Sequence, residues 1–143
     1  MFDPSREQAR DFFFETWRRY RAGEPLAAME RMTLEVMLAH AEYHPELDAP
    51  ERYRELNYFP ELGQTNPFLH MSMHLAIEEQ LSIDQPAGIV GFFAALAGKR
   101  GDRHAALHDA MECLAEMVWR SQRDRAPPDA AAYLDCVEKR SQR

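Results

Sequence analysis

All six histidines of this chain lie in pairs whose members are four residues apart: His40 with His44, His70 with His74, and His104 with His108. Side chains at positions i and i+4 lie on one face of an α-helix. Chance alone would place only about 0.2 such pairs among six histidines in a chain of this length. The spacing therefore predicts that helices organise the chain and that each pair presents two imidazoles on one helical face.

Helix signals recur along the chain and strand signals do not, which predicts an all-α fold. Asp3 with Pro4 opens a first helix that runs to Gly23. Pro25 opens a second helix, which carries the first histidine pair in its last turn and ends before Pro45. The segment 45–64 holds several prolines without a clear period, so we expect a long surface connection with at most one short helical turn.

The second half of the chain continues the helical pattern. Asn66, or Thr65, caps a helix that begins at Pro67, carries the second histidine pair and ends near Ser82. Pro86 opens a short apolar helix that ends at the glycines 98 and 101. Asp102 caps the helix of the third pair, and Asp129 caps a final helix before a polar tail at 139–143. We therefore predict a single domain over residues 1–143, a helical bundle of four principal helices and two short ones.

The charge and the apolar segments exclude several classes of function. A net charge of −7 and a pI near 5.3 argue against nucleic-acid binding. The N-terminus lacks the pattern of a signal peptide, and the longest apolar stretch, 89–97, is too short to span a bilayer. We expect a cytoplasmic protein without membrane contact. A homodimer is compatible with the sequence, which indicates neither a substrate nor a protein partner.

The two cysteines, Cys113 and Cys136, do not form a Cys-x-x-Cys motif. A structural zinc knuckle or a disulfide framework is therefore not expected. We interpret both as reduced, partly buried thiols.

Acidic residues extend two of the histidine pairs by a further helical turn. Glu78 follows His74 by four residues, and Glu112 follows His108 by four. If the two helices pack antiparallel, four imidazoles and two carboxylates meet in one cavity, enough for one metal ion with open positions or for two ions. Mixed nitrogen and oxygen ligands suit iron, zinc, nickel or manganese. The predicted metal ligands are His40, His44, His70, His74, His104, His108 and Glu112.

Individual residues leave alternatives open. Pro45 disfavours helical geometry at His44, so His40 and His44 need not share a face. Glu112 is either a ligand or an acceptor for an imidazole N–H. Glu35, Glu78 and Glu79 are better explained as solvated acids. The histidines could instead be hydrogen-bonded groups within the core.

Three functions follow from these alternatives. The first is a transition-metal-binding bundle, either a metal-dependent hydrolase that activates a bound water or a redox protein. The second is a non-enzymatic interaction or scaffold module without metal, whose 45–64 connection contacts a partner. The third is a pH sensor that uses the histidines as titrating groups between about pH 5 and 7.

Three segments resemble a family of short, uncharacterised proteobacterial proteins that share a domain of unknown function. The segments are Gly63–Ala76 (GQTNPFLHMSMHLA), Glu79–Pro86 (EQLSIDQP), and the later group of His108, Met111–Leu114 (MECL), Glu116 and Trp119. The resemblance covers nearly the whole chain and implies no assigned activity. A looser analogy is with hemerythrins and DinB-like metal-binding bundles, although the histidine and glutamate motifs occur in a different order.

Overall fold

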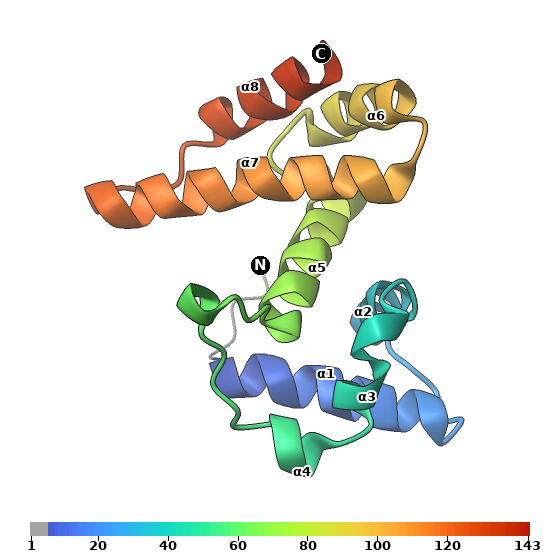
Figure 1. The fold of residues 1–143 in the computed structure, drawn as a ribbon. Helices are drawn as coiled ribbons and strands as arrows, with labels where there is room; N and C mark the ends of the chain where they lie inside the picture. Colours follow the sequence, from blue (N-terminus) through green and yellow to red (C-terminus); the bar gives the residue numbers. More distant parts are fainter. Residues whose placement is uncertain (1–5) are drawn as a thin grey trace. The chain divides into compact units, whose positions relative to one another are not determined.

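The computed structural model describes residues 6–143, and every regular element in that range is helical, as expected for an all-α fold (Figure 1). It contains eight α-helices and two short 3-10 helices, so the prediction of four principal and two short helices is not exact. The elements are α1 (Arg6–Arg21), α2 (Ala28–Leu38), η1 (Ala41–Tyr43), α3 (His44–Leu47), α4 (Pro50–Tyr53), η2 (Pro60–Leu62), α5 (Pro67–Ile83), α6 (Ile89–Arg100), α7 (Arg103–Asp124) and α8 (Ala130–Ser141). None of these helices is both long enough and apolar enough to cross a membrane.

The chain divides into two compact units, Met1–Leu75 and Ala76–Arg143. Helix α5 supplies residues to both units because the division falls within it. The prediction of one domain over the whole chain stays a prediction, and each unit is described by itself below.

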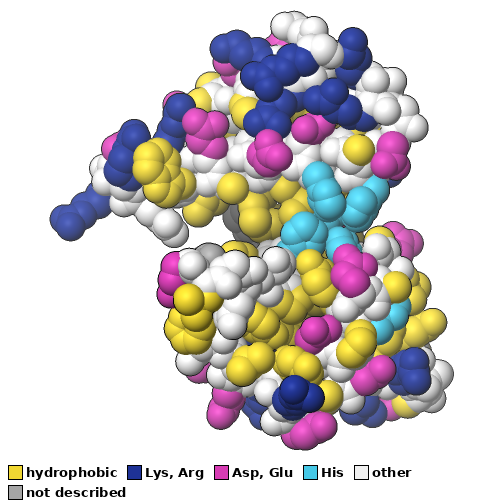
Figure 2. Space-filling view, viewed as in Figure 1, with side chains coloured by type: hydrophobic (Ala, Val, Ile, Leu, Met, Phe, Trp, Pro, Cys, Tyr) yellow, Lys and Arg dark blue, Asp and Glu magenta, His cyan; other side chains and the backbone are white. Residues whose placement is uncertain are grey.

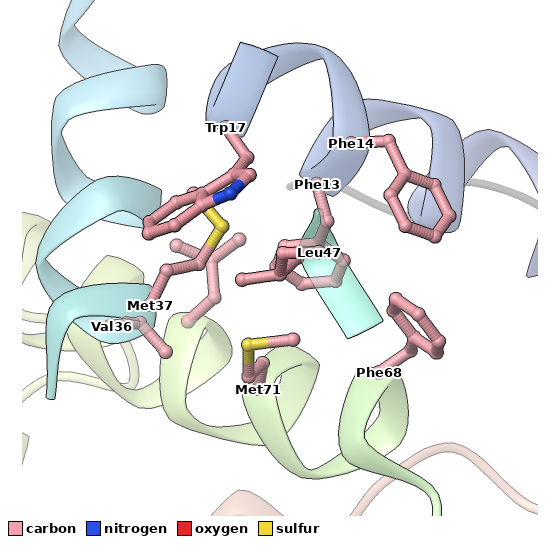
Figure 3. Close-up of a cluster of buried hydrophobic side chains, with 9 residues drawn as sticks. Phe13, Phe14, Trp17, Val36, Met37, Leu47, Phe68 and Met71 are labelled. Carbon is pink, nitrogen blue, oxygen red and sulfur yellow. The ribbon is translucent and has the colours of Figure 1, made fainter. Parts of the chain in front are cut away.

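An aromatic core organises the first unit (Figure 3). Phe13 and Trp17 of α1 are 1% and 3% exposed, and Phe68 at the start of α5 lies with its ring centroid 5.3 Å from that of Phe14. Helix α2 contributes Val36 and Met37, and α3 contributes Leu47. This burial of apolar surface stabilises the segments that position the histidines of the first unit.

Arg10 holds the segment between α4 and η2 against α1. Its side chain is 2% exposed, and Nη1 donates to the carbonyl oxygens of Tyr53, Arg54 and Leu56 at 3.3, 3.1 and 2.7 Å. The guanidinium carbon also lies 4.9 Å from the ring centroid of Phe68. Burial lowers the pKa of Arg10, so these carbonyl contacts offset the cost of desolvating its charge.

The second helix ends earlier than predicted. Helix α2 stops at Leu38, and His40 leaves helical geometry with φ −125° and ψ 65°. Pro45 does not terminate a helix but occupies the first turn of α3, where proline is tolerated because the amide hydrogens there have no partner within the helix. The 45–64 connection contains three short helical elements after His44 rather than one turn at most.

Three of the predicted N-caps are confirmed. Asn66 Oδ1 accepts from the amides of Phe68 and Leu69 at 3.0 and 3.1 Å. Asp102 accepts from two amides at the start of α7, and Asp129 accepts from Ala132 at 3.0 Å. The predicted cap at Asp3 and Pro4 lies outside the described residues.

Two boundaries in the second half differ from the prediction. Helix α6 begins at Ile89 rather than Pro86, after Gly88 adopts a φ of 100° that favours glycine. Helix α8 continues to Ser141, so most of the expected polar tail is helical.

In the second unit α6, α7 and α8 pack against one another, and α5 is fastened to this group by two polar contacts. The buried hydroxyl of Tyr133 donates to Gln80 Oε1 at 2.6 Å. Arg103 at the start of α7 makes two hydrogen bonds, of 2.7 and 3.0 Å, to the carboxylate of Glu78. Glu78 therefore fixes the start of α7, and its interpretation as a solvated acid is wrong.

The prediction of reduced thiols is also wrong. Cys113 and Cys136 form a disulfide that joins α7 to α8. Spacing along the sequence could not indicate this pair, because the two cysteines meet only when α8 folds back along α7.

We expect Arg10→Ala to destabilise the first unit by about 3 kcal/mol, since three carbonyl groups lose a charged donor. Chemical denaturation monitored by tryptophan fluorescence measures this loss. Arg6→Ala is the matched control: Arg6 donates a single exposed bond to Leu56 O, and its loss should cost less than about 1 kcal/mol. Equal effects of the two substitutions would contradict this account.

We expect the double variant Cys113→Ser with Cys136→Ser to lose about 3 kcal/mol of stability, because the crosslink no longer restrains a 23-residue separation in the unfolded chain. Thermal unfolding of the variant and of the oxidised wild type gives the difference. The wild type in excess dithiothreitol should melt close to the variant, whereas an unchanged melting temperature would show that the crosslink adds no stability.

Candidate metal centre

Helix α5 places His70 and His74 side by side, as their spacing predicts. Their Nε2 atoms are 3.2 Å apart, and their ring centroids are 4.8 Å apart. The Asn66 cap starts α5 four residues before His70, which sets the register of both side chains. His74 is 2% exposed and His70 is half-buried, so the pair extends from the interior toward the surface.

His40 joins this pair within the first unit. Its ring centroid lies 4.5 Å from that of His74 and 5.0 Å from that of His70, in edge-on arrangements. The possible ligand nitrogens of His40 and His74 lie within 4.8 Å of each other. The three rings therefore form a nearly equilateral triangle, which we call the histidine triad.

The end of α2 determines both the position and the tautomer of His40. Because the chain leaves helical geometry there, His40 Nδ1 turns back to the carbonyl oxygen of Val36 at 2.7 Å. A carbonyl can only accept, so Nδ1 carries the proton and Nε2 presents a lone pair. A backbone carbonyl that fixes the tautomer in this way is typical of imidazoles that bind metal.

The spacing within the triad matches that of ligands on one ion. Imidazole nitrogens bind zinc at about 2.0–2.1 Å, so two of them lie about 2.9 Å apart at right angles and about 3.4 Å apart in a tetrahedron. The observed 3.2 Å between His70 and His74 falls between these values. The Nε2 of His40 offers a third lone pair, which makes the triad a set of nitrogen ligands with room for others.

Tyr43 is a residue that the sequence pattern did not single out as functional. Its ring stacks on that of His40, with centroids 5.4 Å apart and planes 4° apart. Burial raises the pKa of Tyr43, and the charges of Glu42 and Glu46 raise it further. The phenol therefore stays neutral and covers one side of the triad. The sequence signal for Tyr43 is its position three residues after His40.

Glu46 adds a buried oxygen to the first unit. Within the described part of the chain, its Oε2 is shielded from solvent and makes no hydrogen bond. Burial raises the pKa of Tyr43 and of Tyr58, and the negative charge of Glu46 raises each pKa further. The first unit thus holds a buried carboxylate oxygen in addition to the three imidazoles of the triad.

The structure does not bring His44 into the triad. His44 Nε2 lies 2.7 Å from the carbonyl oxygen of Met37, to which it donates, and the ring packs 4.6 Å from that of Trp17. Through these contacts His44 joins α3 to the core of the first unit.

The third pair lies in the second unit. The rings of His104 and His108 on α7 have centroids 4.4 Å apart, and their possible ligand nitrogens lie within 4.8 Å of each other. The cap at Asp102, which accepts from His104 N, sets the register of this pair just as Asn66 does for α5. The second unit therefore has its own pair of adjacent imidazoles.

Glu112, the other predicted metal ligand on α7, pairs with an arginine instead. Its Oε2 accepts from Arg140 Nη1 of α8 at 2.6 Å, and its side chain is 65% exposed. An exposed carboxylate paired with arginine is a poor metal ligand, because binding an ion would break the pair. The helical register indicated a third ligand at this position, but only the packing of α8 on α7 reveals its arginine partner.

Comparison with known families matches residues 5–139 of the chain to one of them, the Domain of unknown function (DUF1841). No curated protein and no solved structure proved similar to the chain, so the analogy with hemerythrins and DinB-like bundles has no support. The match covers all three segments on which the resemblance rests. The chain belongs to the DUF1841 family.

Proposed function

We propose that this protein binds a transition-metal ion through His40, His70 and His74. The observation that carries the proposal is the 3.2 Å separation of the Nε2 atoms of His70 and His74, next to a third imidazole whose tautomer is already set for ligation. Imidazole nitrogens this close either share a proton or bind a common ion. His40 and His74 are both 2% exposed and His70 is half-buried, so an ion bound here would be largely shielded from solvent.

The ligand chemistry narrows the choice of ion. Both cysteines of the chain are in the disulfide, so no thiolate is available. Nitrogen ligands with oxygen ligands nearby favour zinc, iron, nickel or manganese over copper(I). The sequence-based prediction that His104 and His108 are also metal ligands stays a prediction, and the proposal does not include His44.

Three imidazoles leave at least one coordination position open, which is the arrangement of catalytic rather than structural sites. With zinc the open position supports hydrolysis, and with iron or manganese it supports redox chemistry. The neutral phenol of Tyr43, stacked on His40, limits the access of water from that side. A metal-dependent hydrolase or redox protein is therefore the finer form of the proposal.

The double variant His40→Ala with His74→Ala should lose the metal, because it removes two of the three ligands. Protein purified without an affinity tag is analysed by plasma mass spectrometry, and the wild type should carry about one ion per chain or more. His44→Gln is the matched control: it removes an imidazole four residues from His40 whose Nε2 is held by Met37, and it should keep the metal.

Circular dichroism shows whether each variant is folded. Wild-type protein that carries no metal, takes up none on reconstitution and keeps its melting temperature in chelator would refute metal binding. Loss of metal in the control as well would mean that the fold, not ligation by the triad, decides retention.

The variant His104→Ala with His108→Ala tests the sequence-based prediction that these two histidines also bind metal. If they do, this variant should bind metal with an affinity reduced on the order of 10- to 100-fold or more. Titration with zinc in a competing chelator measures that affinity. Unchanged affinity and stoichiometry would restrict the site to the triad. Glu112→Gln should have no effect, because Arg140 holds that carboxylate.

A second candidate function is an interaction module, favoured by exposed apolar side chains on the 45–64 connection. Leu56, Phe59 and Leu62 are 42%, 45% and 71% exposed. Such residues suit contact with a protein partner, and a partner would be expected to bind whether or not metal is present. A pull-down whose yield falls when Phe59 and Leu62 are replaced by serine, and does not change with chelator, would support this function.

A further inference from the structure

The disulfide of the second unit lines an open cleft. The cleft has a volume of about 460 Å³ and lies between the C-terminal half of α7 and the start of α8, with Cys113, Cys136 and Tyr133 among its lining residues. The disulfide therefore borders a space large enough to admit part of another molecule.

The two sulfur-bearing residues differ in access. Cys113 is 2% exposed and lies on the face of α7 that carries Leu114 and Met111 into the core. Cys136 is half-buried and also lines a second hollow of about 300 Å³. An external nucleophile can therefore approach Cys136 from either hollow, whereas Cys113 borders only the first and is almost fully covered.

Charged side chains of both signs line the approach to Cys136. Arg120 with Glu116 lines both hollows, Arg123 with Asp124 lines the first, and Lys139 with Asp135 lines the second. Arg140 and Arg143 also line the second hollow, where cationic side chains therefore outnumber acidic ones. Figure 2 shows Lys and Arg side chains gathered on the second unit, over α6 and α8. Positive charge near a disulfide attracts and stabilises thiolates, which are the attacking and leaving groups of exchange.

We propose that Cys136 is the site at which a dithiol protein reduces this disulfide. The partner's thiolate forms a bond to Cys136 Sγ, the Cys113–Cys136 bond breaks, and Cys113 leaves with the electron pair and takes up a proton. The partner's second thiol, deprotonated, then attacks its own sulfur in the mixed disulfide and releases Cys136 as a thiol. Two electrons and two protons pass to this chain, and the partner becomes a disulfide.

Reduction removes the covalent link between α7 and α8. Helix α7 also carries His104 and His108, so the disulfide is attached to the helix that holds the third histidine pair. The proposal does not depend on metal binding, because every residue it uses lies in the α7–α8 cleft and none is a candidate ligand.

The test uses the oxidised, full-length chain and a small dithiol protein with a Cys-x-x-Cys site whose resolving cysteine is replaced by serine. This probe forms a mixed disulfide but cannot complete the reduction. Peptide mapping by mass spectrometry identifies which cysteine is captured. We expect capture at Cys136 to exceed capture at Cys113 on the order of tenfold, in keeping with the dependence of exchange on access. Capture mainly at Cys113, or capture only in denaturant, would overturn the proposal.

A matched pair of variants tests the role of charge. Arg120→Ser should slow capture several-fold, with the difference shrinking at high salt. Arg18→Ser is the control: Arg18, like Arg120, is an exposed helical arginine paired with a preceding glutamate, but it lies on α1 of the first unit. Equal rates for the two variants would refute the part assigned to the cations around Cys136.

Discussion

The helical period of α5 is the constraint on which the candidate site and the aromatic core depend. A single helix, capped by Asn66, carries Phe68, Met71 and Leu75 into the aromatic core of the first unit and also buries Ile77 in the second unit. The same period places His70 and His74 one turn apart on another side. A change in the register of α5 would therefore displace the imidazoles and the core residues together, which couples the chemistry of the site to the stability of the fold.

Two backbone carbonyl groups at the end of α2 fix the other two histidines of the first unit. The carbonyl of Val36 holds His40 in the tautomer that leaves Nε2 with a lone pair, and the carbonyl of Met37 holds His44 against Trp17. Both carbonyls become available because α2 ends at Leu38, where the last carbonyl groups of a helix have no partner within it. The end of one helix thus assigns different roles to two histidines that the sequence presents as a pair.

Charged side chains have different kinds of partner in the two units. In the first unit Arg10 is solvated by three carbonyl groups and two aromatic rings, and it holds the connection after α4. In the second unit the pairs Arg103–Glu78 and Arg140–Glu112 join helices across partly exposed surfaces. These carboxylates are engaged by arginine, so the imidazoles remain as the ligand groups with the strongest geometric support.

The sequence by itself determined the helical fold, the caps at Asn66, Asp102 and Asp129, and the pairing of imidazoles on α5 and α7, because these depend on contacts between residues two to four positions apart. Only the tertiary structure decided the rest. It placed His40 beside α5 and His44 beside Trp17. It also paired Glu112 with Arg140 and joined Cys113 to Cys136 in a disulfide. Each of these contacts depends on where a helix ends or on which helix packs against it, and local spacing carries no information about either.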